Sequence, residues 1–385
     1  MNHLYRSLLL AVLLFPLALH AQQLDSMLNI YANDYAQEKV YLQLDKQAYR
    51  PGETVWFKAY IFSGAGPSAM SHNFYAELSD PSGTILQRKV YPVIESSAAG
   101  NFDLPKGISY PYLHIRAYTA WMTNFDSAFY YEKDLRLDDG KVDRARAAGL
   151  APVQTRMQFF PEGGERVAGV GTTVAFLVDD QFGRPVVADG VIENRDGNQV
   201  LGFASAHDGM GKFVLPADAG DSLTAVWKDE EGAAHRTPLP AARRSGIVLR
   251  AEPANQKVLF SVTRSAGSDS RLRRLTIIGH MHQHPVYQAR ISLEDHAESG
   301  GTIPTGTLPS GVLVLTVFDA NMMPLAERAV FVNNHDYLFS PRLSVQDKGV
   351  TRRSKNTLVI DVPDTVTSNL SIAVTDASAD GEFRY

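Results

Sequence analysis

Three histidines at alternate positions are the sharpest candidate for chemistry in this chain. The stretch "GHMHQH" carries them as His280, His282 and His284. Successive side chains of a β-strand point to opposite faces, so this spacing predicts an imidazole row on one face, which would suit a divalent metal ion. Neighbouring histidines on an exposed strand need no ligand, however, and Pro285 can end the strand early. Metal binding by this row stays open, and no residue is assigned as a metal ligand.

Acidic turns and a glycine pair are weaker candidates for ion or phosphate binding. Asp179 and Asp180 in "VDDQFG" and Asp196 in "ENRDG" lack the alternate ligand spacing and the closing bidentate acid of a calcium loop. Turn chemistry explains these acids. Gly163 and Gly164 in "FFPEGG" precede neither a Lys-Ser pair nor a helix, which argues against a phosphate cradle. We therefore expect no cofactor.

Nucleophilic catalysis has no recognisable signature in the sequence. A strained Gly-x-Ser-x-Gly elbow is absent. Cysteine is absent from all 385 residues, which excludes a thiol nucleophile, a cysteine zinc site and disulfides. We expect that the chain is not an enzyme, and that a metal-dependent hydrolase would require the histidine row to converge with an acid.

Aromatic side chains are the remaining candidate for a binding surface. Rings give a large contact area on a flat sheet, so they would suit a sugar or peptide platform. A sandwich core with a tyrosine-rich rim explains the same residues, and this interpretation is favoured. The set comprises Trp56, Phe57, Tyr60, Phe62, Tyr110, Tyr112, Tyr118 and Trp121.

The elements that must position these residues are short strands. After the N-terminal region, apolar runs alternate or carry β-branched and aromatic residues, with Gly, Pro, Asp and Ser clusters between them. This pattern predicts an all-β chain of tandem antiparallel β-sandwiches of the immunoglobulin or fibronectin kind. Helical spacing occurs earlier, with one side formed by Leu24, Met27, Leu28, Tyr31 and Tyr35.

The strand pattern restarts after the connectors "DDGKVDRARAAGLAP" and "PLPAARRSG", which predict domain boundaries. The last piece is too short to close a sandwich of about 100 residues, so we expect apolar positions such as Val359, Ile372 and Val374 to lack partners. The predicted order is a signal peptide (1–21), a helical lead (22–37), a sandwich (38–137), a linker (138–153), a second sandwich (154–241), a third (245–336) and a partial fourth (340–385).

The N-terminus predicts export. Arg6 precedes an apolar run from Leu8 to Leu19, and Ala21 follows as a small residue at a cleavage site. Export without cysteine suits a bacterial periplasm or the periphery of the outer membrane. The net charge of −5 is scattered, without the basic stripe that nucleic acid needs, so we expect no nucleic-acid partner. The expected partner is a protein, either a protease or an envelope protein, and no transmembrane segment is expected in the mature chain.

The stretch "YRPGET" predicts a tight reversal between two strands. Proline presets φ at the second position of a β-turn, and glycine accepts the positive φ that the third position of a type II turn requires. Pro51 and Gly52 occupy these positions.

The surrounding stretch "VYLQLDKQAYRPGETVWFKAYI" resembles the signature of a macroglobulin-type domain of the alpha-2-macroglobulin superfamily. The blocks "FFPEGG", "DGMGKF", "LPSGVLVLTVFD" and "PLAERAVFVN" are similar to successive blocks of Bacteroidetes-type envelope proteins, which often carry a TonB-dependent receptor plug domain downstream. The residues that carry the signature are Asp45, Lys46, Tyr49, Pro51, Gly52 and Glu53.

The resemblance implies an exported binding or scaffold protein with endopeptidase inhibition as the family activity. Protease-trapping members use a Cys-Gly-Glu-Gln thioester, which a chain without cysteine cannot form, so inhibition would be non-covalent. A cleavable bait would have to lie in the connector with Lys141, Arg144 and Arg146. The alternative is the N-terminal extracytoplasmic region of a TonB-dependent outer-membrane receptor or a transport-associated protein.

Overall fold

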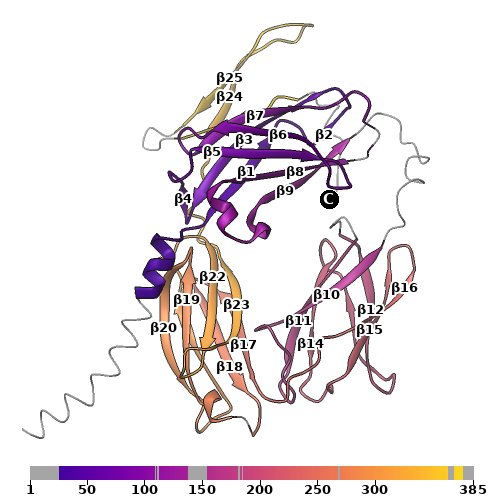
Figure 1. Cartoon of the computed structure of the whole chain (residues 1–385), viewed down its shortest axis with the longest axis vertical. Helices are drawn as coiled ribbons and strands as arrows, with labels where there is room; N and C mark the ends of the chain where they lie inside the picture. Colours follow the sequence, from indigo (N-terminus) through magenta and orange to yellow (C-terminus); the bar gives the residue numbers. More distant parts are fainter. Residues whose placement is uncertain are drawn as a thin grey trace, which may run out of the picture. The chain divides into compact units, whose positions relative to one another are not determined.

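The structure is a computed structural model of an all-β chain (Figure 1). The predicted signal peptide and the predicted linker lie outside the described residues. The structure describes residues 26–108, 110, 112–137, 154–180, 183, 185–267, 269–362 and 368–375.

Internal contacts divide the chain into two compact units. One contains the strands of residues 37–137 together with the C-terminal residues from His335 onward. The other contains the N-terminal helix and the strands between residues 154 and 334. Each unit is built from antiparallel sheets packed face to face, as the alternating apolar pattern predicts.

The first sandwich has a four-stranded and a five-stranded sheet. The four-stranded sheet consists of β1 (Glu38–Leu44), β3 (Thr54–Ser63), β4 (Gly66–Pro67) and β7 (Ser97–Asp103), with β3 in contact with the other three. The five-stranded sheet has the order β2 (Ala48–Tyr49), β9 (Tyr131–Leu137), β8 (Tyr112–Thr119), β5 (Asn73–Ser79) and β6 (Ile85–Pro92). Two 3₁₀ turns, Trp121–Asn124 and Ser127–Phe129, connect β8 to β9.

Strict alternation explains why β1 and β3 form this sheet. In β1, Val40, Leu42 and Leu44 are buried, whereas the residues between them are exposed. Phe57 on β3 packs in the same core and contacts Phe74 of the opposite sheet, with ring centroids 6.1 Å apart. Period-two burial of this kind is what a strand with one solvated face requires.

One pairing departs from the antiparallel pattern. β2 is a two-residue strand that pairs parallel to β9, with Ala48 opposite Arg136 and Tyr49 opposite Leu137. The chain leaves the four-stranded sheet at the end of β1, pairs briefly with the five-stranded sheet and returns as β3. This excursion is too short for a sequence pattern to reveal, because two residues show no periodicity.

The second sandwich has a three-stranded and a four-stranded sheet around Trp227 and the ring cluster of Phe176, Phe203 and Phe213. The first sheet has the order β10 (Thr155–Pro161), β11 (Thr172–Asp180) and β14 (Met210–Leu215). The second has the order β13 (Gln199–Ala204), β12 (Ala188–Asn194), β15 (Leu223–Asp229) and β16 (Ala234–Pro238).

The third sandwich repeats this arrangement around a core that includes Leu249, Val262, Ile277 and Leu315. Its three-stranded sheet has the order β17 (Ile247–Ala254), β18 (Lys257–Arg264) and β21 (Glu298–Pro304). Its four-stranded sheet has the order β20 (His284–Ser292), β19 (Arg274–Met281), β22 (Gly311–Phe318) and β23 (Pro324–Val332), and the 3₁₀ turn Ser270–Leu272 precedes β19.

The block "FFPEGG" joins the second sandwich to the third, within one compact unit. Glu162 Oε1 accepts hydrogen bonds from Ala251 N at 3.3 Å and from Arg328 Nε at 3.1 Å. The carbonyl oxygen of Gly163 accepts a hydrogen bond from Glu327 N at 3.3 Å. Because β17 and β23 are edge strands, this loop satisfies polar groups that the edges would otherwise expose.

Residues beyond the third sandwich form a hairpin of β24 (Arg342–Lys348) and β25 (Asn356–Asp361). Every residue of β24 is exposed. Farther along, Ile372 and Val374 are 67% and 82% exposed. Ile372 and Val374 therefore have little cover among the described residues, whereas Val359 on β25 is half-buried.

The N-terminal helix covers residues 26–33. Met27, Tyr31 and Tyr35 are exposed, and Ala32 is the buried residue. Of the predicted apolar side, these three residues therefore face solvent, Leu28 is half-buried, and Leu24 lies outside the described residues. The segment is held by its backbone instead, because Gln283 Nε2 donates a hydrogen bond to the carbonyl oxygen of Tyr35 at 3.1 Å.

Candidate functional site

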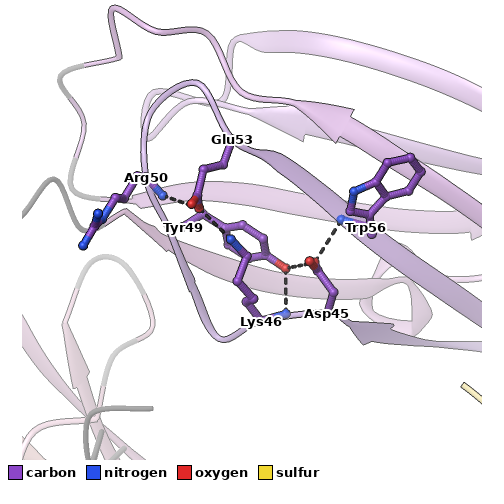
Figure 2. A network of polar contacts seen from close by, with 6 residues as sticks. All are labelled: Asp45, Lys46, Tyr49, Arg50, Glu53 and Trp56. Carbon is purple, nitrogen blue, oxygen red and sulfur yellow. Dashed lines mark hydrogen bonds and ion pairs between the residues drawn. The ribbon is translucent and has the colours of Figure 1, made fainter. Parts of the chain in front are cut away.

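The signature residues lie where the chain crosses between the sheets of the first sandwich (Figure 2). Asp45 and Lys46 directly follow β1, Tyr49 ends β2, and Glu53 precedes β3. Their side chains point toward one another across this crossing. The short strand β2 thus brings residues from one loop into a single polar network.

Tyr49 and Asp45 form the buried half of this network. The Tyr49 hydroxyl donates to Asp45 Oδ1 at 2.5 Å and accepts from Lys46 N at 3.0 Å. Asp45 Oδ1 also accepts from Trp56 N at 3.0 Å, which ties the end of β1 to β3. Burial raises the pKa of the Tyr49 hydroxyl far above its ordinary value, and the hydrogen bond to Asp45 raises it further. Tyr49 is therefore a neutral donor in this network.

Glu53 forms the outer half. Its Oε2 accepts from Lys46 Nζ at 2.8 Å and from Arg50 N at 2.9 Å. Partial burial acts to raise the pKa of Glu53, but these hydrogen bonds outweigh it and hold the pKa below its ordinary value. Glu53 is therefore an anion that fixes the turn to Lys46.

The turn itself has the backbone that its sequence predicts. Glu53 N donates to the carbonyl oxygen of Arg50 at 3.0 Å, and Gly52 has a φ of +86°. Positive φ at the third position is the mark of a type II turn. Leu104 N donates to the carbonyl oxygen of Glu53 at 2.8 Å, which anchors the turn to the chain that follows β7.

The network uses its polar groups to hold backbone and side chains in place. Asp45 and Glu53 accept from main-chain N–H groups, and Lys46 is paired with Glu53. A general base or a nucleophile must instead present its reactive atom to a substrate. The geometry therefore supports a structural role for the signature residues.

Gly52→Val is expected to lower the free energy of unfolding by roughly 2 kcal/mol, because a β-branched residue resists positive φ. A Cβ at this position would also lie 3.0 Å from Lys106 Cγ. Gly52→Asn is the control, since asparagine tolerates positive φ better. Thermal unfolding of both variants checks the turn, and a wild-type melting temperature for Gly52→Val would contradict it.

The predicted common face of His280, His282 and His284 is wrong. β19 ends at Met281, and His282 and Gln283 form a two-residue hairpin turn with φ values of +48° and +69°. His284 begins the next strand, so the row is folded back on itself. Pro285 lies opposite His280 inside the hairpin and does not end a strand.

Metal-ligand clusters are also absent from the described part of the chain. No group of three His, Cys, Asp or Glu side chains converges there as a metal site would require. His280 is partly buried, and this burial lowers its pKa, although the charge of Glu327 opposes the shift. Glu327 also accepts a hydrogen bond from the hydroxyl of Thr316 at 3.0 Å, so His280 lies in the packed surroundings of β22 and β23.

The acids considered for calcium lie in ion pairs and turns. Asp179 binds the guanidinium of Arg156 with both oxygens, at 2.7 and 2.8 Å. Asp196 lies in a turn where Asn194 Oδ1 accepts from its backbone N–H at 3.0 Å. Turn and strand geometry therefore accounts for these residues, and Asp180 is buried at the end of β11.

The aromatic residues named from the sequence do not form one platform. Phe57 and Tyr112 are buried. Tyr118 lies on the outer face of the five-stranded sheet, where its ring stacks on Tyr75 and its hydroxyl donates to Glu77 at 2.8 Å. Phe57 faces the core from the four-stranded sheet, whereas Tyr112 and Tyr118 lie on β8 of the five-stranded sheet, so the residues belong to different surfaces.

A subset gathers on the outer face of the four-stranded sheet. Tyr41 on β1 lies opposite Tyr60 on β3, and Trp56 and Phe62 lie on the same side of β3 by alternation. Tyr41, Trp56 and Phe62 are 53%, 58% and 39% exposed. Lys58 lies between them, with its Nζ 5.4 Å from the centroid of the Tyr60 ring. We call these residues the aromatic face.

The opposite outer face of the first sandwich holds a cavity of about 380 Å³ under the turn between β5 and β6. Its floor includes Glu77, Arg116 and Glu132. Glu77 is paired with Arg88 at 2.8 Å, and Arg116 with Glu132 at 2.8 Å. The charges along this floor therefore alternate and neutralise one another, which stabilises neighbouring strands of a sheet.

Tyr41 and Lys58 belong to this surface, although neither was predicted from the sequence as part of one. The alternation of apolar and polar residues along each strand indicates that both side chains point outward. Tyr41 alternates with the buried Val40 and Leu42, and Lys58 lies between the buried Phe57 and Ala59. The connector that would hold a protease bait, with Lys141, Arg144 and Arg146, lies outside the described residues.

Within the described ranges, no helix has the length and apolar character needed to cross a membrane.

No protein-family model matches the chain, and no curated protein matches it. Among solved structures, it is similar to a Salmonella alpha-2-macroglobulin reacted with methylamine, at 12% identity and a TM-score of 0.24, over 85% of this chain and 25% of that one. The native E. coli alpha-2-macroglobulin gives 12% identity and a TM-score of 0.24 over 86% and 25% of the two chains. The BSP domain of a biofilm-associated protein gives 11% and 0.26 over 82% and 70%. The chain thus spans about a quarter of these macroglobulins, and nothing about its activity follows from the likenesses.

Proposed function

We propose that this chain is an exported binding or scaffold protein of the bacterial cell envelope that contacts a protein partner through the aromatic face and has no catalytic activity of its own. The exposure of Tyr41, Trp56 and Phe62 on one side of one sheet carries this proposal. Contiguous exposed aromatic side chains are costly in water and are enriched where proteins bind one another.

The chemistry of the face suits a protein partner. Rigid rings supply contact area with little loss of side-chain entropy, and Lys58 adds one cation among them. The signature network, by contrast, is occupied with the turn that it stabilises. We therefore assign partner binding to the aromatic face and a stabilising role to the signature residues.

Endopeptidase inhibition, if the chain has it, is non-covalent, because no cysteine is present to form a thioester. It would depend on steric cover or on strand addition to an exposed sheet edge. The alternative, the N-terminal region of a TonB-dependent receptor, stays a prediction from the sequence blocks.

Site-specific photo-crosslinking in the producing cells tests the binding role. Tyr41 and Phe62 are replaced one at a time by a photo-crosslinking phenylalanine analogue. Because both lie on the aromatic face, the same partner protein is expected to be captured at both positions, as one band on a denaturing gel with one identity by mass spectrometry.

Leu259 is the matched control, since it is 44% exposed on a strand of the third sandwich. The analogue at Leu259 is expected to leave that band absent. Equal capture at Leu259, or no capture at the two face positions, would overturn the proposed function.

A further inference from the structure

A segment from the C-terminal region lies on the aromatic face, within the same compact unit as the first sandwich. Lys58 Nζ donates to the carbonyl oxygen of Leu370 at 2.9 Å and also contacts Asn369 Oδ1. Asn369 Nδ2 donates to Ser97 Oγ at 3.0 Å, on the neighbouring strand β7. Residues 368–375 therefore reach the sheet through β3 and β7 together.

The same segment also reaches the tyrosine of the face. Ser371 lies close enough to Tyr60 for its side chain to oppose the burial that raises the pKa of the Tyr60 hydroxyl. Asn369 and Ser371, two residues apart, therefore both approach the sheet. Ile372 and Val374 are 67% and 82% exposed and Leu370 is 38% exposed, so little apolar area of the segment beyond Leu370 is buried.

We propose that the aromatic face is a docking surface for an extended peptide, and that residues 368–375 of the chain itself occupy it as a reversible, autoinhibitory cover. This inference rests on the proposed function, because it describes how the same face is regulated. A partner's extended segment must displace the cover in order to bind.

The contacts define the chemistry of the occupant. Lys58 binds a main-chain carbonyl, a group that every peptide offers. Ser97 binds the side-chain amide of Asn369, and Tyr60 lies near the side chain of Ser371, two residues later. A partner segment therefore needs a main-chain carbonyl for Lys58 and small amide or hydroxyl side chains two residues apart.

The small number of contacts explains why the cover is reversible. Exposed hydrogen bonds each contribute little net free energy, since water competes for both partners. Asn369, Leu370 and Ser371 are themselves exposed. A partner that also packs on the rings of Tyr41 and Trp56 gains contact area that residues 368–375 do not use.

An engineered cysteine pair tests the cover in the full-length chain. Ser97→Cys and Asn369→Cys place two thiols where their native side chains are hydrogen-bonded, in a chain with no other cysteine. A disulfide between them closes a loop between positions 272 residues apart, so mild oxidation is expected to give a faster-migrating band on a non-reducing denaturing gel.

Three controls make the disulfide test specific. Pairing Ser97→Cys with Val350→Cys, at a position that is 88% exposed, is expected to form the bridge much more slowly. Adding Lys58→Met to the first pair is expected to slow bridge formation about fivefold, the value of one hydrogen bond. The synthetic peptide SNLSIAVT, added in excess, is expected to slow it as well.

The acylation rate of Lys58, measured in chains without engineered cysteines, is an independent test. Lys58 is expected to react faster with an amine-acylating reagent after Asn369→Ala, while the exposed Lys39 serves as an internal reference. Equal bridge formation in both cysteine pairs, or unchanged reactivity of Lys58, would overturn the cover.

The two proposals fail separately. Loss of the cover with intact photo-crosslinking at Tyr41 would leave the binding role standing and remove only its regulation. Loss of photo-crosslinking with an intact disulfide between positions 97 and 369 would remove the partner and leave residues 368–375 as a structural contact of the fold.

Discussion

Tyr49→Ala is expected to lower the free energy of unfolding of the first sandwich by about 4 kcal/mol, as for other large buried rings. The Tyr49 side chain is 1% exposed and packs in the core beside β1 and β3. Its loss leaves a cavity and also removes the partner of Lys46 N and a donor to Asp45. Chemical denaturation followed by far-UV circular dichroism measures the change.

Tyr49→Phe separates the hydroxyl from the ring. It keeps the packing and removes only the two hydrogen bonds, so we expect a loss of about 2 kcal/mol. If Tyr49→Phe were as stable as the wild-type chain, the polar network would contribute nothing and the structural account of the signature would be wrong.

Gly163→Val is expected to destabilise the joint between the second and third sandwiches by roughly 3 kcal/mol, from positive-φ strain and a backbone clash. Gly163 has a φ of +86°, and a Cβ there would lie 3.0 Å from Leu249 N and 3.2 Å from its carbonyl oxygen. Because these are main-chain atoms of β17, they cannot move aside without disturbing the sheet. In differential scanning calorimetry, we expect the second and third sandwiches to unfold in two separate transitions, because the contact that couples them is weakened.

Gly164→Val is the matched control. Gly164 also has a positive φ, +103°, but nothing lies within 4 Å of a Cβ built on it. We expect about 1 to 2 kcal/mol from backbone strain alone, with a single transition retained. Equal losses in the free energy of unfolding for the two variants would show that the close approach of Gly163 to Leu249 contributes nothing to the effect.

The fold class followed from local patterns. The alternation of apolar and polar residues in β1 and β3 indicates which side chains face the core. The pair Asp196-Gly197 indicates the hairpin between β12 and β13. These signals are short-range, so one sequence is enough to read them.

Two long-range features could not be predicted in this way: the contact between the second and third sandwiches, and the pairing of β2 with β9. Glu162 binds Arg328, which lies 166 residues away, and no periodicity reports such a contact. The pairing of β2 with β9 has the same character, because Tyr49 and Leu137 meet only in the folded chain. Long-range pairing is decided by tertiary packing rather than by local propensity.

The prediction of a histidine row was wrong for a different reason. His282 and Gln283 adopt the positive φ values that glycine and asparagine usually supply in a two-residue hairpin. The turn therefore carried no recognisable sequence signal, and the sequence pattern predicted one continuous strand where the structure has β19 and β20. The aromatic face, by contrast, was readable from the alternation of Tyr41 and Lys58 with their buried neighbours.

The yield of photo-crosslinking from the Tyr41 position, compared in two further backgrounds, tests most directly whether function lies on the sheet surface. Trp56→Ala removes an exposed ring of the face, and Lys46→Gln removes the partly buried ion pair of the signature network, which we expect to cost about 1 kcal/mol. The account predicts that the crosslinked partner is lost with Trp56→Ala and retained with Lys46→Gln. Retention with Trp56→Ala and loss with Lys46→Gln would contradict it and place partner binding at the signature residues.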